Sequence, residues 1–419
     1  MILKILPKSD FAKNVLTLLT GTTVAQAIPI AISPILTRIY SPKDFGVLAL
    51  FISITSIFAS ITTARYELAI MLPKSDKEAI NIAALSLIVN LFISLALFLA
   101  ILLFSDNIIA LLGNKEISIW LYFIPITIFL VGLFNVLNYL NTREKSFKDI
   151  SKATVFKSLS LATIQILVGL IKQGASGLIS GQIVSSFVAN TKLAKNILSN
   201  KELIGAINLK VIKKVAKKYI KFPKYSMPTA LIHSFGSDYL NILISTLFNI
   251  TTLGFYSFAI KMLGMPTSLI GESISQVFFK EAVDEKHKFG NSKRAFIATT
   301  KRLILIGVPL FMFIYFSAED IFAFVFGKEW QIAGEYAKIV TPLFFANFVF
   351  VSISSIFDIY DGLKIELILQ TIMMILSITI IYIFRNYGFR EFLQIYTIFN
   401  CFMYGISFYI AYKLAKGDR

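Results

Sequence analysis

The chain has 419 residues, of which 56% are hydrophobic and 16% charged, and its mean hydropathy is +0.74. Soluble domains are about 25% charged and about 45–50% apolar, so these values exclude a disordered chain and argue against a water-soluble enzyme. The net charge of +17 leaves two interpretations open, a nucleic-acid-binding protein or a membrane protein with basic cytoplasmic loops. The single cysteine, Cys401, excludes a disulfide framework, and two histidines argue against a His-rich metal site.

Apolar stretches long enough to cross a bilayer recur along the whole chain. Each is close to the length of about 20 residues that a hydrocarbon core of about 30 Å requires of a helix. The sequence therefore predicts an all-α integral membrane fold with about twelve transmembrane helices. In chain order, the expected helices lie at residues 14–37, 45–64, 81–104, 118–141, 153–171, 174–194, 225–249, 252–279, 303–326, 335–357, 365–384 and 391–412.

Lysines and arginines gather in alternate loops of this predicted topology. With the amino terminus in the cytoplasm, 31 of them fall on the inner side, 7 on the outer side and 3 within predicted helices. This distribution follows the positive-inside rule and predicts a multi-pass protein with both termini in the cytoplasm. It also explains the basic charge without nucleic acid as a partner. Lys157, one of the three within helices, is expected to extend toward the cytoplasmic interface.

The longest predicted loop, residues 195–224, carries nine lysines and a single acidic residue, Glu202. We expect it to form an amphipathic helix that lies on the anionic lipids of the inner leaflet and joins two halves of the chain. A regulatory or partner-binding role is the alternative. The apolar residues that recur at helical spacing within it are Ile204, Ile207, Val211 and Val215.

The two halves on either side of this basic segment show a weak internal repeat. A shift of 208 residues places residues 45–48 over residues 253–256. Six helices in each copy would keep both copies in the same orientation, so we expect two six-helix bundles, residues 1–194 and 225–419, related by a pseudo-two-fold axis along the membrane normal. The shift also superposes two stripes of small or polar residues, which are Ser53, Ser56, Ser60, Thr63 and Glu67 in the second helix and Lys261, Gly264, Ser268, Gly271 and Ser275 in the eighth.

Polar stripes on the first two helices of each predicted bundle indicate one shared cavity. Lipid offers no partner to a polar side chain, so such a stripe must face protein or water. Close packing of small residues between helices is the alternative explanation for the serines and glycines, but it does not explain the ionised groups. The candidate substrate-cavity residues are Gln26, Ser53, Ser56, Ser60, Arg65, Ser237, Asn241, Lys261 and Ser268.

The ionised groups are the candidates for transport chemistry. Lys261 suits an anionic phosphate, or an ion pair with Asp238. Asp238 and Glu272 are candidates for binding a coupling H⁺ or Na⁺. Arg65 and Glu67 are gate candidates at the inner end of the second helix, with a simple helix-end charge pair as the alternative. The sequence contains no catalytic constellation, metal-ligand set or cofactor motif, so we expect neither an enzyme nor a resident cofactor.

Four segments resemble the bacterial polysaccharide-repeat flippases, which include the O-antigen flippases and belong to the MATE-like multidrug/oligosaccharidyl-lipid/polysaccharide exporter superfamily. The segments are residues 64–73 (ARYELAIMLP), residues 40–46 (YSPKDFG), residues 141–148 (NTREKSFK) and parts of residues 254–279. The resemblance implies two bundles with alternating access in the bacterial inner membrane. It also implies an undecaprenyl-pyrophosphate-linked oligosaccharide as substrate, which Lys261 and Arg65 would contact, and other polysaccharide-assembly membrane proteins as partners.

Two other functions stay open at this point. A cation-coupled drug or ion antiporter of the same architecture would need a deeply buried acid, for which Asp238 is the candidate, although basic and serine-rich stripes favour an anionic substrate. A membrane-embedded glycan polymerase or ligase normally has a large outer loop, and the predicted outer loops are short. The sequence therefore favours a flippase that moves a lipid-linked sugar repeat unit in polysaccharide biosynthesis.

Overall fold

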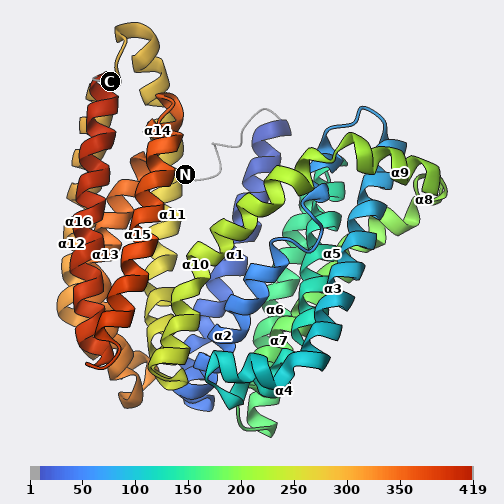
Figure 1. Ribbon diagram of the computed structural model, residues 1–419. Coiled ribbons are helices and arrows are strands. Elements are labelled where there is room, and N and C mark those ends of the chain that lie inside the picture. Colours follow the sequence, from blue (N-terminus) through green and yellow to red (C-terminus); the bar gives the residue numbers. More distant parts are fainter. Residues whose placement is uncertain (1–9, 418–419) are drawn as a thin grey trace, which may run out of the picture. The chain divides into compact units, whose positions relative to one another are not determined.

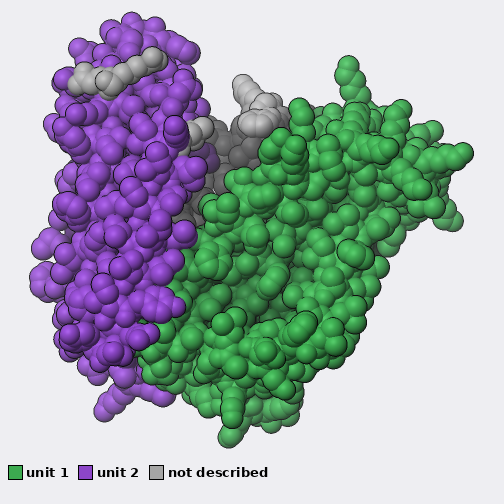
Figure 2. Space-filling view, in the orientation of Figure 1, with its two compact units in different colours: residues 1–254 green, residues 255–419 purple. Residues whose placement is uncertain are grey.

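A computed structural model describes the backbone of residues 10–417, which forms helices joined by short turns and contains no β-strand (Figure 1). The chain divides into two compact units, residues 1–254 and residues 255–419 (Figure 2). The side chains that lie outside the described residues are those at 10–16, 19, 265, 266, 268, 269, 272 and 363.

The first unit is a bundle in which α6 lies against both α1 and α7, α5 packs on α3 and α7, and α10 packs on α2 (Figure 1). Its long helices are α1 (Asp10–Ile39), α2 (Pro42–Ala59), α3 (Asp76–Leu112), α5 (Ile124–Arg143), α6 (Phe147–Ile171), α7 (Ser176–Ser199) and α10 (Met227–Leu247). Its short helices are η2 (Tyr66–Met71), η3 (Lys115–Ile117), α4 (Ser118–Leu121), α8 (Lys201–Gly205), α9 (Leu209–Lys218) and η4 (Phe222–Ser226).

The second unit is built around a core rich in phenylalanine, to which Phe278, Phe296 and Phe357 contribute fully buried rings. Large aromatic side chains supply most of the apolar area that such a core buries. Helix α13 packs on α12 and α16, and α15 packs on α16. Helix α11 (Ile250–Phe289) begins in the first unit and continues in the second, which also contains α12 (Lys293–Phe326), η5 (Lys328–Trp330), α13 (Gln331–Ile353), α14 (Ile356–Ile359), α15 (Leu363–Phe384) and α16 (Phe389–Lys416).

The predicted all-α membrane fold is confirmed, because each of the twelve predicted stretches overlaps a long helix of its own. Within residues 10–417, nine helices are long and apolar enough to span a membrane, and α7, α10 and α11 are the long helices outside this set. Helix α7 shows why such a helix can be less apolar. Asn190 donates to Leu130 O at 2.9 Å, and a Cβ on Gly177 would lie 1.9 Å from Tyr40 Oη. Small and amide-bearing residues let membrane helices pack closely.

The end of α2 differs from the prediction. The sequence pattern predicts a helix to residue 64 and a stripe that continues to Glu67, but α2 ends at Ala59 and a turn leads into η2. Ala64 and Arg65 have φ values of 47° and 63°, in the left-handed region that residues with a Cβ rarely adopt. A right-handed α-helix cannot contain two such residues, so Glu67 does not lie on the helical stripe of α2.

The basic segment forms α8 and α9, and the apolar face of α9 lies on the protein. Ile212 and Val215 are buried in the core of the first unit. Two hydrogen bonds fix the segment in place, from Asn81 Nδ2 to Ala206 O at 2.9 Å and from Tyr66 Oη to Ala216 O at 3.1 Å. An amphipathic helix therefore forms over α9, but the predicted stripe is interrupted, because Ile204 lies in α8 and Ile207 lies between the two helices. The apolar face of α9 packs on α3 and η2.

Lysines cover the opposite side of this segment. Lys213, Lys214 and Lys217 are exposed, and Lys218 Nζ donates to Glu78 Oε1 of α3 at 2.5 Å. That hydrogen bond raises the pKa of Lys218. Contact between these lysines and the anionic leaflet at residues 195–224 stays a prediction.

The compact units divide at residues 254 and 255, inside α11, because α9 and α10 pack with the helices that precede them. The predicted boundaries at residues 194 and 225 follow the sequence repeat and not the packing. As a division into two repeats they stay a prediction.

Candidate functional site

A hydrogen bond joins α2 to α10 within the first unit, where Asn241 Nδ2 donates to Ser53 Oγ at 2.9 Å. The carboxyl group of Asp238 on α10 lies beside the hydroxyl groups of Ser53 and Ser56 on α2. Ser53 is buried, whereas Ser56, Asp238 and Asn241 are partly exposed. These four residues form a polar network between the two helices.

This network brings together four of the predicted site residues, across 188 positions of sequence between Ser53 and Asn241. Polar groups in a membrane protein are retained where they satisfy one another or face water. Asp238 can accept a proton or hold a small cation here. Its serine and asparagine partners can exchange their hydrogen bonds with a ligand that is rich in hydroxyl groups.

The other predicted polar residues have simpler surroundings. Ser60 Oγ donates to Ile57 O at 2.7 Å, and Ser237 Oγ donates to His233 O at 3.0 Å. These bonds satisfy the hydroxyls locally, and a place in the cavity stays a prediction for both serines. Gln26 is exposed on α1. The side chains of Ser268 and Glu272 lie outside the described residues.

Lys261 lies in the second unit, about 16 Å along α11 from Ile250 at about 1.5 Å per residue, which is close to half the thickness of a bilayer core. Its side chain is exposed and makes no hydrogen bond or ion pair in the described part of the chain. An ammonium group at such a depth costs about 2.5–3.5 kcal/mol unless it is paired or hydrated. Hydration of Lys261 in a cavity stays a prediction. Its predicted ion pair with Asp238 stays a prediction.

The gate candidates Arg65 and Glu67 bind each other. Arg65 Nη1 lies 3.4 Å from Glu67 Oε1, and Thr63 Oγ1 donates to Glu67 Oε2. The Glu67 side chain is 2% exposed and that of Arg65 is 30% exposed, so the guanidinium group neutralises the carboxylate from its solvent side. The pair lies within one turn of chain. This geometry is that of a local charge pair, and a role in gating stays a prediction.

Two glycines make a reciprocal contact at the start of α2 and α11, within the first unit. A Cβ on Gly46 would lie 1.8 Å from Ile250 O, and a Cβ on Gly254 would lie 1.8 Å from Pro42 O. The predicted shift of 208 residues converts residues 42 and 46 into residues 250 and 254. A contact in which each copy touches the other with the same residues is what a two-fold axis produces. The contact therefore supports the sequence repeat.

Lys157 of α6 is a membrane-embedded cation that the sequence did not identify as a site residue. Its Nζ lies 5.0 Å from the ring centroid of Phe134 on α5. The expectation that this lysine extends to the cytoplasmic interface is wrong, because the ammonium group is directed across the bundle to another helix. The sequence carries a signal for this position, since Lys157 lies four residues after Ala153, on the buried face of α6.

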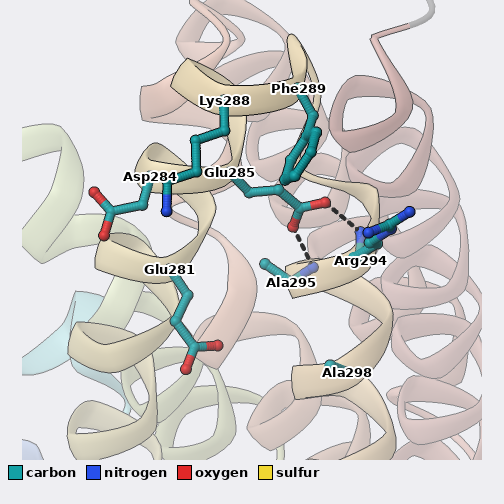
Figure 3. A pocket seen from close by; sticks show the side chains of 8 residues that line it. All are labelled: Glu281, Asp284, Glu285, Lys288, Phe289, Arg294, Ala295 and Ala298. Carbon is teal, nitrogen blue, oxygen red and sulfur yellow. Dashed lines mark hydrogen bonds between the residues drawn. The ribbon is translucent and has the colours of Figure 1, made fainter.

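The second unit contains an open pocket of about 380 Å³ between the end of α11 and the start of α12 (Figure 3). Glu285 accepts hydrogen bonds from the backbone nitrogens of Arg294 and Ala295, at 3.0 and 2.5 Å. Its carboxylate therefore caps the first turn of α12, as negative charge at a helix start should. Among the described residues, no group of three or more His, Cys, Asp or Glu side chains could hold a metal ion.

Comparison with known sequences places the chain in a polysaccharide biosynthesis family. The family described as "Polysaccharide biosynthesis protein" matches residues 35–334. The succinoglycan biosynthesis transport protein ExoT of Rhizobium meliloti (strain 1021) is 23% identical over 308 residues, which cover 72% of this chain and 59% of that protein. The chain spans about six tenths of the length of the curated relatives that it matches.

Two solved structures have a similar fold. The lipid II flippase MurJ in an inward closed conformation matches with a TM-score of 0.74 and 14% identity, over 95% of this chain and 87% of that one. A multidrug resistance MATE family transporter of the MOP superfamily, in an inward-facing conformation, matches with a TM-score of 0.68 and 15% identity, over 96% and 98% of the two chains. At these identities the likeness concerns the fold, and it confirms the predicted MATE-like architecture.

Proposed function

We propose, from the premise that the chain belongs to the polysaccharide biosynthesis protein family, that it is a flippase for a polyprenyl-pyrophosphate-linked oligosaccharide. The observation that carries the proposal is the family match over residues 35–334. The substrate moves from the inner to the outer leaflet of a bacterial inner membrane, for a surface polysaccharide such as O-antigen. Both termini lie in the cytoplasm, and the chain acts by transport and not by catalysis.

The physical task is to shelter a diphosphate and its sugars from hydrocarbon while the polyprenyl tail stays in lipid. The network of Ser53, Ser56, Asp238 and Asn241 supplies donors and acceptors that suit sugar hydroxyls. Lys261 supplies a hydrated cation that suits phosphate oxygens. Exposed apolar side chains along α3, such as Phe92 at 73%, match a surface that lies in lipid. Alternating access of two bundles would carry the polar headgroup across the membrane.

The direct test is restoration of surface polysaccharide in bacterial strains that lack their own flippase. Expression of this chain should restore the polymer in at least one strain whose repeat unit it accepts. Strains that also lack the first glycosyltransferase of the pathway should show no restoration, because they make no substrate. A chain that inserts normally but restores no polymer in a panel of chemically different repeat units would contradict the proposal.

The proposed phosphate contact is tested by charge reversal at Lys261. Lys261→Glu should abolish export because it places a negative charge against the substrate phosphate, whereas Lys261→Arg should retain export. Lys328→Glu is the matched control, since Lys328 is also an exposed lysine of the second unit. Normal surface polysaccharide in the Lys261→Glu strain, with normal membrane insertion, would refute this role.

A cation-coupled antiporter is the second candidate, and Asp238 is the observation that favours it. A carboxyl group beside two serine hydroxyls inside a membrane bundle can bind a coupling H⁺ or Na⁺. Transport of a cationic dye by purified chain in proteoliposomes, lost in Asp238→Asn, would favour this function. Dependence of polysaccharide export on Asp238, without dye transport, would instead make Asp238 the coupling residue of the flippase.

The basic segment and other membrane proteins complete the proposed set of partners. The exposed lysines of α9 lie where the anionic inner leaflet would meet them, since α9 packs beside the start of α3. Membrane proteins of the polysaccharide-assembly pathway would supply the substrate and receive the product.

A further inference from the structure

Lys157 is a cation deep in the first unit that the proposed function does not use. Its depth follows from two helices. At one end of α6, Asp149 forms an ion pair with a lysine of α7 at 3.2 Å. At the same end of the bundle, Arg143 of α5 forms a second ion pair, with an aspartate at the start of α3 at 2.8 Å. At about 1.5 Å per residue, Lys157 lies about 12 Å beyond the first pair, and Phe134 lies about 13 Å beyond the second. The positions along both helices place the ammonium group near the middle of the hydrocarbon core of a bilayer, which is about 30 Å thick.

The side chain points into the bundle. Lys157 is half-buried and lies one helical turn after the buried Ala153 of α6. Its ammonium group reaches Phe134 of the neighbouring α5, whose ring packs against the buried core of the first unit. The exposed stripe of α6 is different and consists of Lys152, Phe156, Leu159, Thr163, Leu167 and Leu170.

A polar side chain of α1 lies at the same level. Helices α1 and α6 run side by side, with a Cβ on Gly21 placed 1.8 Å from Ser151 Oγ, and with Tyr40 Oη donating to Gln165 O at 2.5 Å. This register places Gln26 within about one turn of the level of Lys157. Three helices of the unit therefore contribute a cation, an aromatic ring and an amide at mid-depth.

The ammonium group lacks a counter-charge. In the described part of the chain the ammonium group of Lys157 makes no hydrogen bond or ion pair, and its Nζ contacts the face of the Phe134 ring. A cation–π contact offsets only part of what it costs to bring an ammonium group into a membrane. A compact cation with three free donors is suited to the oxygens of a phosphate or a carboxylate.

We propose that Lys157 binds an anionic group of the substrate, phosphate or carboxylate, as that group passes the middle of the membrane. Phe134 holds the ammonium group in position until the anion arrives. The inference rests on the proposed function, because it requires a substrate with an anionic group that crosses the bilayer. The anion is either the diphosphate of the lipid carrier or an acidic sugar of the repeat unit.

The experiment measures binding of two probes to the purified full chain by calorimetry. One probe is farnesyl diphosphate, which has the diphosphate without sugar, and the other is a free disaccharide that contains glucuronate. Lys157→Met should weaken binding of at least one probe by roughly ten- to a hundredfold, as expected when a charged hydrogen bond is lost. Lys157→Arg should stay within a few-fold of wild type. Lys152→Met is the matched control, because Lys152 lies on the exposed stripe of the same helix.

The probe that loses affinity identifies the source of the anion. Unchanged binding of both probes to Lys157→Met, or no binding of either probe to the wild-type chain, would overturn the inference. If Lys157 has only a structural role, the Lys157→Met variant should have equal or greater thermal stability and unchanged binding, because methionine is apolar and of similar length. Export by the wild-type chain separates the role of Lys157 from the proposed function. If the wild-type chain restores polysaccharide, and the Lys157→Met variant binds the probes and exports normally, the proposed function stands and only the role of Lys157 fails.

Discussion

The change Gly46→Ala should force the starts of α2 and α11 apart. An added Cβ would lie 1.8 Å from Ile250 O, whereas ordinary van der Waals contact begins at 3.4 Å, so the helices must separate by about 1.6 Å. The obstructing atom belongs to the backbone and cannot rotate away. Overpacking of this kind typically costs about 1–3 kcal/mol. This loss should exceed the gain of about 0.5–1 kcal/mol that alanine brings as the better helix former.

The reciprocal geometry makes a second and sharper prediction. Gly254→Ala should have a similar effect, because its Cβ would meet Pro42 O at the same distance of 1.8 Å. Since one separation of the two helices relieves both clashes, the double variant should lose less stability than the sum of the two single variants. The interaction between sites in contact is commonly about 0.5 kcal/mol or more, which makes the difference measurable.

The measurement is the thermal unfolding midpoint of the purified full chain in detergent. Gly405→Ala is the matched control, since an added Cβ there would meet no atom within 4 Å. It should leave stability unchanged or raise it slightly. Strictly additive losses in the double variant, or a Gly46→Ala variant as stable as Gly405→Ala, would refute the reciprocal contact.

Three further variants test separate parts of the first unit by the same measurement. Asn241→Leu should lower stability by about 0.5–1 kcal/mol because it removes the hydrogen bond to Ser53; a variant as stable as wild type would show that this bond does not hold α10 on α2. Ile212→Ala should cost about 2 kcal/mol or more, whereas Ile207→Ala, at a side chain 41% exposed, should cost less than about 0.5 kcal/mol. Equal effects would mean that α9 is not docked on the protein. Ala64→Gly should stabilise by about 1 kcal/mol, since a φ of 47° strains a residue with a Cβ; a loss would mean that the methyl group of Ala64 makes contacts worth more than the strain.

The long helices could be predicted because their cause is local. A stretch of about 20 apolar residues has one stable backbone conformation in lipid, the helix, whichever neighbours it has. The end of α2 could not be predicted in this way. Ser60 and Thr63 continue the helical spacing of α2, and left-handed Ala64 and Arg65 follow from how η2 packs on α3 and α5. That packing depends on residues distant in sequence.

The site could be predicted in composition and less well in arrangement. Helical spacing singled out Ser53, Ser56, Asp238 and Asn241, which the structure brings together, and their role in a site stays a prediction. Spacing alone could not distinguish these residues from Ser60 and Ser237, whose hydroxyls bond to their own backbone. At the same helical spacing, a serine hydroxyl can hydrogen-bond either to the backbone of its own helix or to a side chain of a neighbouring helix. Which of these bonds forms depends on where the neighbouring helix lies, and the spacing does not give that position.

The repeat combines symmetric packing with asymmetric chemistry. The glycine contact at residues 46 and 254 is the same in both directions. The shift that relates these glycines superposes Ser53 on Lys261, yet Ser53 is buried and hydrogen-bonded to Asn241, whereas Lys261 is exposed and positively charged. Symmetry of the repeat accounts for the packing of the helices at the two glycines. Packing alone gives no reason for a buried serine at position 53 and an exposed lysine at the equivalent position 261. The proposed substrate carries both hydroxyl groups and a diphosphate and would give that reason, because the two positions could then serve different chemical groups.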